Sequence, residues 1–456
     1  MNWTLSVLLA YVAAQLAIGF VTSRRVRTEE DYILAGRQLG PWLATFSIFA
    51  TWFGAETCIG AAGAVYAGGL SEAHADPFGY TLCLLLMAVL FAATLWRRQL
   101  MTLGDLIRDR FGPTAESLAV LMMIPTSLLW AGAQIRAFGQ VLVVNSGWQL
   151  GTAITFAAAV VVIYTVSGGL WADAATDLLQ GVVLIVGLLV VFAAVIAQGG
   201  GVHALWGSVP AERWDPFGSG HGLRGQTLEA WLVPILGSVT AQELASRVMA
   251  SRSARVARNA TYVAAMVYLA IGMIPALLGL AGPTLIPGLT ESETFLPQLA
   301  HAKLGPILAA VFSGALISAI LSTVDSSLLA VGALGSHNLV LRAYPRASER
   351  QRVIAARVGV VLAGLGAYAL AFSEEGVYGL VEQASAFGGA GIFVLMCFGL
   401  FSRFGGRWAG CTALIVSIVV QLWGTYVAVH PYPFTLSLAI SAVCFVAVGS
   451  FERGRA

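Results

Sequence analysis

The residues with the clearest chemical potential lie together in one apolar stretch, residues 316–331, with the sequence LISAILSTVDSSLLAV. The stretch is long enough to help cross a bilayer, yet its centre carries a cluster of hydroxyl groups and one carboxyl group. A carboxylate in hydrocarbon costs about 2.5–3.5 kcal/mol on insertion scales. Asp325 therefore indicates a functional site within the membrane.

The spacing of these oxygens predicts a site for a small hard cation. On a helix, Ala319, Ser322 and Thr323 stand at positions i, i+3 and i+4, so one carbonyl and two hydroxyls can converge on one point. Neutral oxygens grouped in this way suit a hard cation. Ser322, Asp325 and Ser326 share a neighbouring face that could hold a second cation or a proton. The alternative is that the hydroxyls only bond back to carbonyls of their own helix and allow close helix packing.

The composition predicts an all-α polytopic membrane protein. The 456 residues are 58% hydrophobic and only 11% charged, whereas soluble chains carry about 25% charged residues. The apolar stretches, of which 41–69 and 304–340 are too long for one straight crossing, predict about thirteen transmembrane helices. These lie near 4–22, 41–69, 77–97, 116–144, 148–167, 174–198, 228–250, 257–281, 304–340, 353–372, 376–401, 406–429 and 432–450.

The basic residues predict the orientation of these spans. With thirteen spans, most of the 25 Lys and Arg residues fall on one side, in clusters such as Arg24 to Arg27 and Arg342 to Arg357. Arg247, which follows the seventh span, is one of the basic residues assigned to this side, whereas Arg136 lies inside a span. The positive-inside rule then places the N-terminus outside and the C-terminus in the cytoplasm. The net charge of +2 is a topology signal and implies no nucleic-acid partner.

The chain lacks the sequence motifs of nucleotide-binding proteins, zinc sites and common hydrolases. Its one lysine, Lys303, follows no Gly-rich phosphate-binding loop, so no nucleotide is expected to bind. The five cysteines fall inside predicted spans without a CxxC pair, which argues against a disulfide framework or a zinc site. No HExxH or GxSxG sequence occurs, and we expect no enzymatic activity. Uphill transport would have to be driven by an ion gradient.

Two spans are interrupted at corresponding positions. Residues 43–69 break near Gly54 and carry Glu56, and residues 229–249 break near Pro234 and carry Gln242. Paired interruptions of this kind indicate an inverted-repeat transporter with its site at the midplane; the alternative is kinks without function. The single transmembrane domain, 1–456, would comprise an entry helix and connector (1–40), two five-span halves (41–198 and 228–401) and two peripheral helices (402–456).

Three more polar residues fall within or beside these spans. Arg136 would need a carboxylate, a substrate anion or a route to the interface. Asp173 is expected to be a solvated residue at the start of a helix. Asp177 lies a turn deeper and is expected to face Ser322 and Ser326.

Five motifs together resemble the sodium/solute symporter family, in order and over about residues 20–400. They are DYILAGRQLGPW, GAETCIGAAGAVYAGG, TLGDLIRDRFG, YTVSGGLWADAATDLLQG, and SAILSTVDSSLL with a following SHNL. The resemblance implies a LeuT-like fold, a five-plus-five inverted repeat with broken helices, and Na⁺ as the coupling ion. It implies that the shared sodium site is formed by the carbonyls of Ala50, Phe53 and Ala319 and the hydroxyls of Ser322 and Thr323.

The resemblance also implies a second cation site in some members. Here it would involve Asp177, Ser322, Asp325 and Ser326. Asp325 stands where some of those members have a hydroxyl, which leaves open whether a second Na⁺ or a proton binds.

The candidate substrate residues indicate an organic solute with a cationic group. Trp52, Tyr80 and Trp130 occupy places that resemble the choline-transporting branch, although Ala241 stands where that branch has another aromatic residue. Aromatic faces attract quaternary ammonium ions, and Glu56 would add a countercharge. Arg136 would favour a carboxylate unless it pairs with Glu56. The candidate set is completed by Gln242.

We therefore expect a Na⁺-coupled symporter that imports an amine, amino acid or betaine-like solute by alternating access. It would lie in the lipid bilayer of a bacterial inner membrane. The alternatives are a proton-coupled carrier of the same fold, a transporter-like ligand sensor without flux, and an ion channel. The oligomeric state does not follow from these residues.

Overall fold

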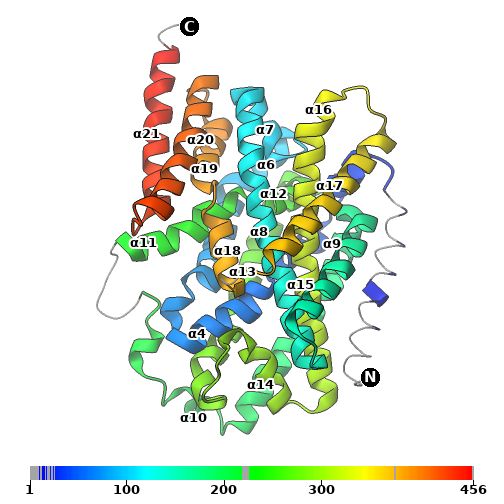
Figure 1. Cartoon of the computed structure of the whole chain (residues 1–456), viewed down its shortest axis with the longest axis vertical. Coiled ribbons are helices and arrows are strands. Elements are labelled where there is room, and N and C mark those ends of the chain that lie inside the picture. Colours follow the sequence, from blue (N-terminus) through cyan, green and yellow to red (C-terminus); the bar gives the residue numbers. More distant parts are fainter. Residues whose placement is uncertain are drawn as a thin grey trace.

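The computed structural model describes residues 26–217, 225–373 and 376–453, with scattered positions before residue 26. Within these residues the chain is almost entirely helical, and its only strand-like pairing is an isolated bridge between Leu39 and Ser251. The predicted all-α class is confirmed. Figure 1 shows long helices running roughly parallel, as expected for a chain whose backbone groups must be satisfied within each membrane-crossing segment.

The helices of the first half follow the predicted spans closely. Their bounds are α2 (Glu29–Leu34), α3 (Pro41–Trp52), α4 (Ala62–Gly68), α5 (Tyr80–Leu86), α6 (Ala92–Arg98), α7 (Leu103–Phe111), α8 (Pro113–Ser146), α9 (Leu150–Gln198) and α10 (Val202–Trp206). The π-helical turns η3 (Glu56–Ala61), η5 (His74–Gly79) and η6 (Met87–Phe91) connect parts of them. Within α9 the backbone breaks at Gly169, whose φ of 59° suits glycine.

The second half repeats this pattern of long and broken helices. Its helices are α11 (Gly225–Leu232), α12 (Gln242–Ala250), α13 (Ala254–Leu285), α14 (Phe295–Lys303), α15 (Pro306–Ala333), α16 (Leu341–Ala343), α17 (Glu349–Leu370), α18 (Gly376–Ala386), α19 (Gly389–Phe401), α20 (Arg407–Leu422) and α21 (Pro433–Arg453). The π-helical turns η8 (Val233–Gly237) and η11 (Leu334–Val340) belong to this half.

The predicted count of thirteen spans is not confirmed. Among the described residues, eight helices are long and apolar enough to cross a membrane, or up to ten when each bent pair counts as one span. Two shorter apolar helices, Leu150–Ile163 and Thr227–Thr240, fall at the fifth and seventh predicted spans. The predicted first span, 4–22, lies almost wholly outside the described residues.

The predicted helix breaks are present. Helix α3 ends at Trp52, and the chain bends by 49° before it continues through η3 into α4. In the seventh span, Ala241 is extended with a ψ of 130°, which separates the segment containing Pro234 from α12. A further bend of 42° separates α18 from α19 at Gly388 and was not expected from the sequence. Stretch 304–340, predicted to be too long for one straight crossing, forms one long helical segment that runs from α15 through η11 into α16.

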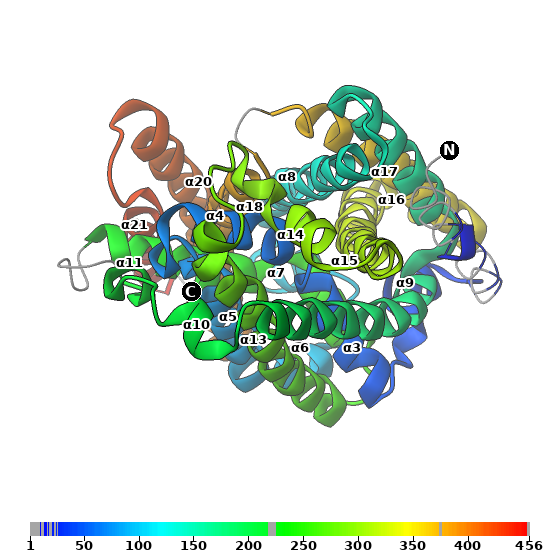
Figure 2. The same cartoon turned by 90° about the horizontal axis from the view of Figure 1, so that it is seen from below.

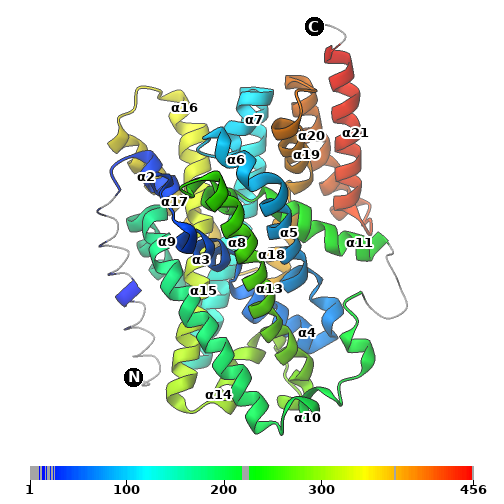
Figure 3. The same ribbon diagram turned by 180° about the vertical axis from the view of Figure 1, so that it is seen from behind.

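Helix α15 lies at the centre of the molecule. It is the most buried of the candidate spans and packs against α3, α8, α9 and α17. Figure 2 shows α8 and α9 on either side of α15, with α20 and α21 at the edge of the bundle. Helix α13 crosses the face seen in Figure 3 and packs beside α3 and α5. The oxygen-rich stretch of the sequence is therefore enclosed by protein.

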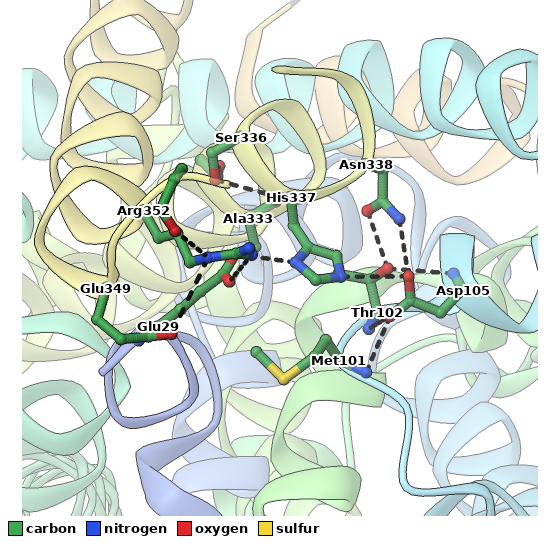
Figure 4. Close-up of polar contacts among 12 residues, drawn as sticks. Glu29, Met101, Thr102, Asp105, Ala333, Ser336, His337, Asn338, Glu349 and Arg352 are labelled. Carbon is green, nitrogen blue, oxygen red and sulfur yellow. Dashed lines mark hydrogen bonds and ion pairs between the residues drawn. The ribbon is translucent and has the colours of Figure 1, made fainter. Parts of the chain in front are cut away.

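A cluster of polar side chains connects four elements near the C-terminal end of α15, where the chain continues towards α16. The His337 imidazole lies between two carboxylates, with Nδ1 at 2.8 Å from Glu29 and Nε2 at 3.3 Å from Asp105. Arg352 reaches Glu29 at 3.2 Å. Figure 4 shows these side chains pointing towards one another from α2, α7, η11 and α17. We call Glu29, Asp105, His337 and Arg352 the His337 cluster.

Candidate functional site

The break after α3 brings backbone oxygens and side chains to one point. The last carbonyls of a helix lack intrahelical donors, so the end of α3 leaves backbone oxygens available. Gly54 follows the break, and a Cβ atom there would lie 2.6 Å from the Thr323 hydroxyl and 2.7 Å from a Glu56 carboxylate oxygen. Only glycine allows this approach of the broken helix to α15. Thr323 and Glu56 thus face the same side of Gly54.

The predicted sodium ligands lie where α3 meets α15. The Thr323 hydroxyl is 3.3 Å from the Ala50 carbonyl of α3 and 3.2 Å from the Ala319 carbonyl of its own helix. Phe53, whose carbonyl completes the predicted set on this side, is the first residue after α3 and has a non-helical ψ of 79°. Ser322 is the neighbour of Thr323 and is buried. The arrangement offers neutral oxygens from two elements, a donor set suited to Na⁺.

The back-bonding alternative holds for some hydroxyls of α15 and fails for others. Ser326 donates to the Ser322 carbonyl at 2.7 Å, and Ser327 donates to the Thr323 carbonyl at 3.0 Å. Ser322 instead donates across to Asp177 of α9. Thr323 reaches Ala50 on α3 as well as its own helix. Both predicted hydroxyl ligands of the sodium site therefore link α15 to other helices.

Asp177 lies where the sequence predicted, beside the hydroxyl face of α15. Its carboxylate accepts hydrogen bonds from Ser322 and, at 2.6 Å, from Ser47 of α3. The Thr51 hydroxyl, one turn along α3, lies 3.4 Å from the Ser326 hydroxyl. The second candidate site is thus formed by side chains of α3, α9 and α15.

Two predictions about charged residues near this site are wrong. Asp173, expected to be solvated, has no exposed surface, and Arg247, counted with the loop residues, is 1% exposed. The Arg247 guanidinium forms an ion pair with Asp173 and a hydrogen bond to Ser326. The break before α12 explains the difference, because it turns Arg247 inwards beneath the hydroxyl face of α15. The seventh span therefore contributes a buried cation to the second candidate site.

Asp325 adds a further buried carboxyl group. It is 1% exposed, and its Oδ1 atom has no hydrogen-bond partner in the described part of the chain. It interacts electrostatically with Asp173, Asp177 and Arg247. Three carboxyl groups and one guanidinium group are thus buried close together. One positive charge cannot balance three ionised carboxyl groups, so this region needs additional cations or protons.

The three predicted aromatic residues form one cluster. Trp52 and Trp130 stack with ring centroids 4.9 Å apart and planes inclined by 9°. Tyr80 lies 6.0 Å from Trp52 and 5.8 Å from Trp130. Tyr80 also lies within hydrogen-bonding distance of Ser385 on α18, at 3.2 Å. All three rings are buried, and they come from α3, α5 and α8.

Carboxyl groups lie on the segments that carry the aromatic cluster. Glu56 accepts a hydrogen bond of 2.6 Å from Gln134, and the Gln134 carbonyl oxygen accepts one of 3.0 Å from the Ala55 backbone. Asp76 accepts a hydrogen bond of 2.6 Å from Thr57. Neither Gln134 nor Asp76 was predicted from the sequence as a site residue. Asp76 could have been recognised from its spacing, because it lies four residues before Tyr80. The same spacing separates Trp52 from Glu56.

Arg136 and Gln242 are engaged away from the aromatic cluster. Arg136 donates to the carbonyls of Ala371 and Ser373 beyond the end of α17, so it does not pair with Glu56. Gln242 accepts from the Leu103 backbone at the start of α7 and donates to Ser246. One guanidinium nitrogen of Arg136 thus binds the free carbonyls at a helix end, and Gln242 binds the backbone at the start of a neighbouring helix. The structure therefore does not bring these two predicted residues to the site.

Comparison with known proteins places the chain in a family. The model of the sodium:solute symporter family matches residues 32–414. A high-affinity choline transporter from Caenorhabditis elegans is 28% identical over 77% of this chain and 63% of its own length. A sodium/proline symporter from Salmonella typhimurium is 27% identical over 91% of this chain and 86% of its own. The match to the choline transporter thus spans less than two thirds of that protein.

The fold is shared with solved transporters. The structure of a Na⁺-coupled sialic acid symporter in a substrate-bound outward-open state aligns with a TM-score of 0.85 and 18% sequence identity, over 99% of this chain and 98% of that one. The predicted LeuT-like architecture with broken helices is confirmed by this likeness and by the breaks described above. With its family model matched over most of its length, the chain belongs to the sodium:solute symporter family.

Proposed function

We propose that this protein is a Na⁺-coupled secondary active symporter that imports a small organic solute by alternating access. The observation that carries the proposal is the meeting of the broken α3 with the hydroxyl face of α15 at Thr323. Na⁺ at this junction would hold the two elements together. Its occupancy would then bias the equilibrium between outward-open and inward-open states, because a ligand shifts an equilibrium by its differential affinity for the two states.

The donor set supports Na⁺ in particular. The proposed ligands are neutral oxygens, as hard cations prefer. The proposed ligands are the carbonyls of Ala50, Phe53 and Ala319 and the hydroxyls of Ser322 and Thr323.

A second cation or a proton is proposed for the neighbouring carboxyl groups. Asp177, Asp325 and Ser326 would form this site with Ser322. Arg247 already contributes one positive charge there through Asp173 and Ser326. The remaining carboxyl groups would be balanced by Na⁺ or by protonation.

The solute is proposed to be an amine, an amino acid or a betaine-like molecule. The support is the buried aromatic cluster together with the carboxyl group of Glu56, which suit an organic cation. Relatives named as choline transporters and sodium/proline symporters add support, since choline is an organic cation and proline is an amino acid. We further propose a bacterial inner membrane, with the N-terminus outside and the C-terminus in the cytoplasm, from the clustering of arginines.

The proposed sodium site can be tested by removing its hydroxyls one at a time. In Thr323→Ala or Ser322→Ala, we expect the Na⁺ concentration for half-maximal uptake in proteoliposomes to rise about tenfold, equivalent to about 1.4 kcal/mol of lost binding free energy. Ser327→Ala is a matched control, because its buried hydroxyl bonds only back to Thr323 of its own helix in the described structure. Unchanged Na⁺ dependence in both test variants would contradict the site.

The alternative functions predict different results with the wild-type protein. A proton-coupled carrier would keep accumulating solute when K⁺ replaces Na⁺ at fixed pH. A ligand sensor would bind solute but show no counterflow in proteoliposomes. An ion channel would pass currents far above the turnover of a carrier. The proposed symporter should stop accumulating solute without Na⁺ and should support counterflow with it.

A further inference from the structure

Two buried carboxylate oxygens near the aromatic cluster lack partners. Glu56 and Asp76 have no exposed surface. In the described part of the chain, Glu56 Oε1 and Asp76 Oδ1 accept no hydrogen bond. Buried polar atoms are almost always paired, so an unpaired one calls for a partner that is not part of the fold. Two such atoms on neighbouring segments call for a ligand that donates to both.

The other oxygen of each carboxyl group is held in place. Glu56 Oε2 accepts from Gln134, which the Ala55 backbone orients in turn. Asp76 Oδ2 accepts from Thr57, whose hydroxyl lies 3.0 Å from the Tyr268 hydroxyl. In each carboxyl group, one oxygen atom therefore accepts a hydrogen bond from the protein, and the other oxygen atom is left for a ligand. This is how a preorganised acceptor for a ligand is built.

The two carboxyl groups belong to one site. Glu56 lies next to Thr57 in η3, and Thr57 bonds directly to Asp76 of η5. The two acids also interact electrostatically. Neither forms an ion pair with a basic side chain among the described residues, and Arg247 is paired with Asp173 instead. The site thus contains two carboxyl groups and, among the described residues, no basic side chain that pairs with them.

The aromatic cluster does not form an open cage around a quaternary ammonium ion. The rings of Trp52 and Trp130 stack with their centroids 4.9 Å apart, so no cation fits between the two rings and each ring loses one face to the other. A quaternary nitrogen also offers no N–H group, so the free oxygens of Glu56 and Asp76 would stay unpaired. Both observations favour an ammonium group that donates hydrogen bonds.

We propose that the transported solute is a protonated primary or secondary amine whose N–H groups donate to Glu56 Oε1 and Asp76 Oδ1. The inference rests on the proposed symport function and adds the chemical class of its solute. The aromatic cluster would then pack against the apolar part of the solute. Charge-assisted hydrogen bonds are the strong ones, so these two contacts should dominate selectivity.

The test compares matched pairs of molecules that differ in N-methylation. Thermal stabilisation of the full-length protein in Na⁺ would be measured with ethanolamine against choline, glycine against trimethylglycine, and proline against N,N-dimethylproline. We expect the N–H member of the best-binding pair to bind at least about tenfold more tightly than its fully methylated partner. Equal or tighter binding of the methylated partner, or no stabilisation by any N–H amine, would overturn the inference.

Conservative variants link the preference to the two acids. In Asp76→Asn and Glu56→Gln, the N–H member should lose its advantage, so the affinity ratio within the pair falls about tenfold or more. A ratio is independent of how much protein folds. Glu212→Gln on the exposed loop before α11 is the control and should keep the wild-type ratio. An unchanged ratio in both test variants would also overturn the inference. Loss of Na⁺-dependent uptake in the wild type would instead overturn the symport function itself.

Discussion

Gly54 shows how much of the site depends on a single position. It packs between the Thr323 hydroxyl and the Glu56 carboxylate, both closer to its hypothetical Cβ than real Cβ contacts allow. In Gly54→Ala, we therefore expect α3 and α15 to separate and Na⁺-driven uptake to fall at least tenfold. Uptake in proteoliposomes measures this effect. Gly335→Ala is the matched control, because a Cβ there meets no atom within 4 Å; equal uptake by the two variants would contradict the close approach.

The ion pair between Asp173 and Arg247 is a second feature with a direct test. Both side chains are buried, so removal of one partner leaves an uncompensated charge that costs about 3–5 kcal/mol. We expect Asp173→Asn or Arg247→Gln to lower the thermal stability of the purified protein strongly. The double variant, which buries no unpaired charge from this pair, should recover part of the loss. If each single variant is as stable as the wild type, the pair is not buried as described.

Single residues differed in how well the sequence predicted them. Asp177, Ser322 and Thr323 could be placed from helical spacing and motif resemblance, because both restrict which face a residue occupies. Asp173 could not, because its partner Arg247 comes from a different half and only the break before α12 brings the two together. Asp76 and Gln134 were missed because their partners, Thr57 and Glu56, lie on other elements, and helical spacing relates only residues of one helix.

Breaks in helices position the site, and most of them were visible in the sequence. Gly54 and Pro234 marked the two interruptions, since glycine and proline weaken helices and are tolerated in membranes where freed backbone groups meet protein. The bend between α18 and α19 falls at Gly388, with a φ of 72°, and was missed although Gly389 follows directly, because other glycines in these spans lie within continuous helices. The extra length of 304–340 is taken up by a π-helical turn that continues the helix past α15. The division into halves at 41–198 and 228–401 stays a prediction.

The His337 cluster connects elements on one side of the molecule and predicts an acid-sensitive contribution to stability. Burial alone would raise the pKa of Glu29 and of Asp105. The hydrogen bonds and charge of His337, joined at Glu29 by Arg352, outweigh burial and hold both pKa values below their usual range. Carboxyl groups with lowered pKa values stabilise the fold above their ordinary pKa of about 4, and this contribution is lost as the pH falls through the lowered values.

We therefore expect His337→Gln to lower stability at pH 7 by about 1–3 kcal/mol, the range for charge-assisted hydrogen bonds. The difference from the wild type should shrink below about pH 4, where the carboxyl groups become protonated. Thermal melts of the purified protein across this pH range measure both effects. His203→Gln, on an exposed helix, is the control and should follow the wild type. A pH-independent difference would show that the cluster acts through packing rather than charge.

Around its central helix, α15, the protein buries more acidic than basic side chains. Asp173, Asp177 and Asp325 share the interior with Arg247, and none is more than 1% exposed. Burying ionised carboxyl groups without compensation is costly, so the fold is complete only when cations or protons accompany them. In the proposed mechanism this requirement would link ion binding to the conformational state, because the helices that carry the proposed ion sites also contact those of the aromatic cluster.

Asp325 offers the clearest test of that link, because Asn keeps its shape and removes its charge. We expect Asp325→Asn to lower Na⁺-driven accumulation several-fold, while thermal stability stays close to that of the wild type because the uncharged amide at this position needs no neutralising cation or proton. Accumulation under a Na⁺ gradient measures coupling, and counterflow without a gradient is the control for solute binding and movement. If Asp325 carries a proton, the pH dependence of wild-type accumulation should disappear in the variant; if it binds Na⁺, the Na⁺ dependence should become less steep. Full accumulation by the variant would exclude a coupling role for Asp325.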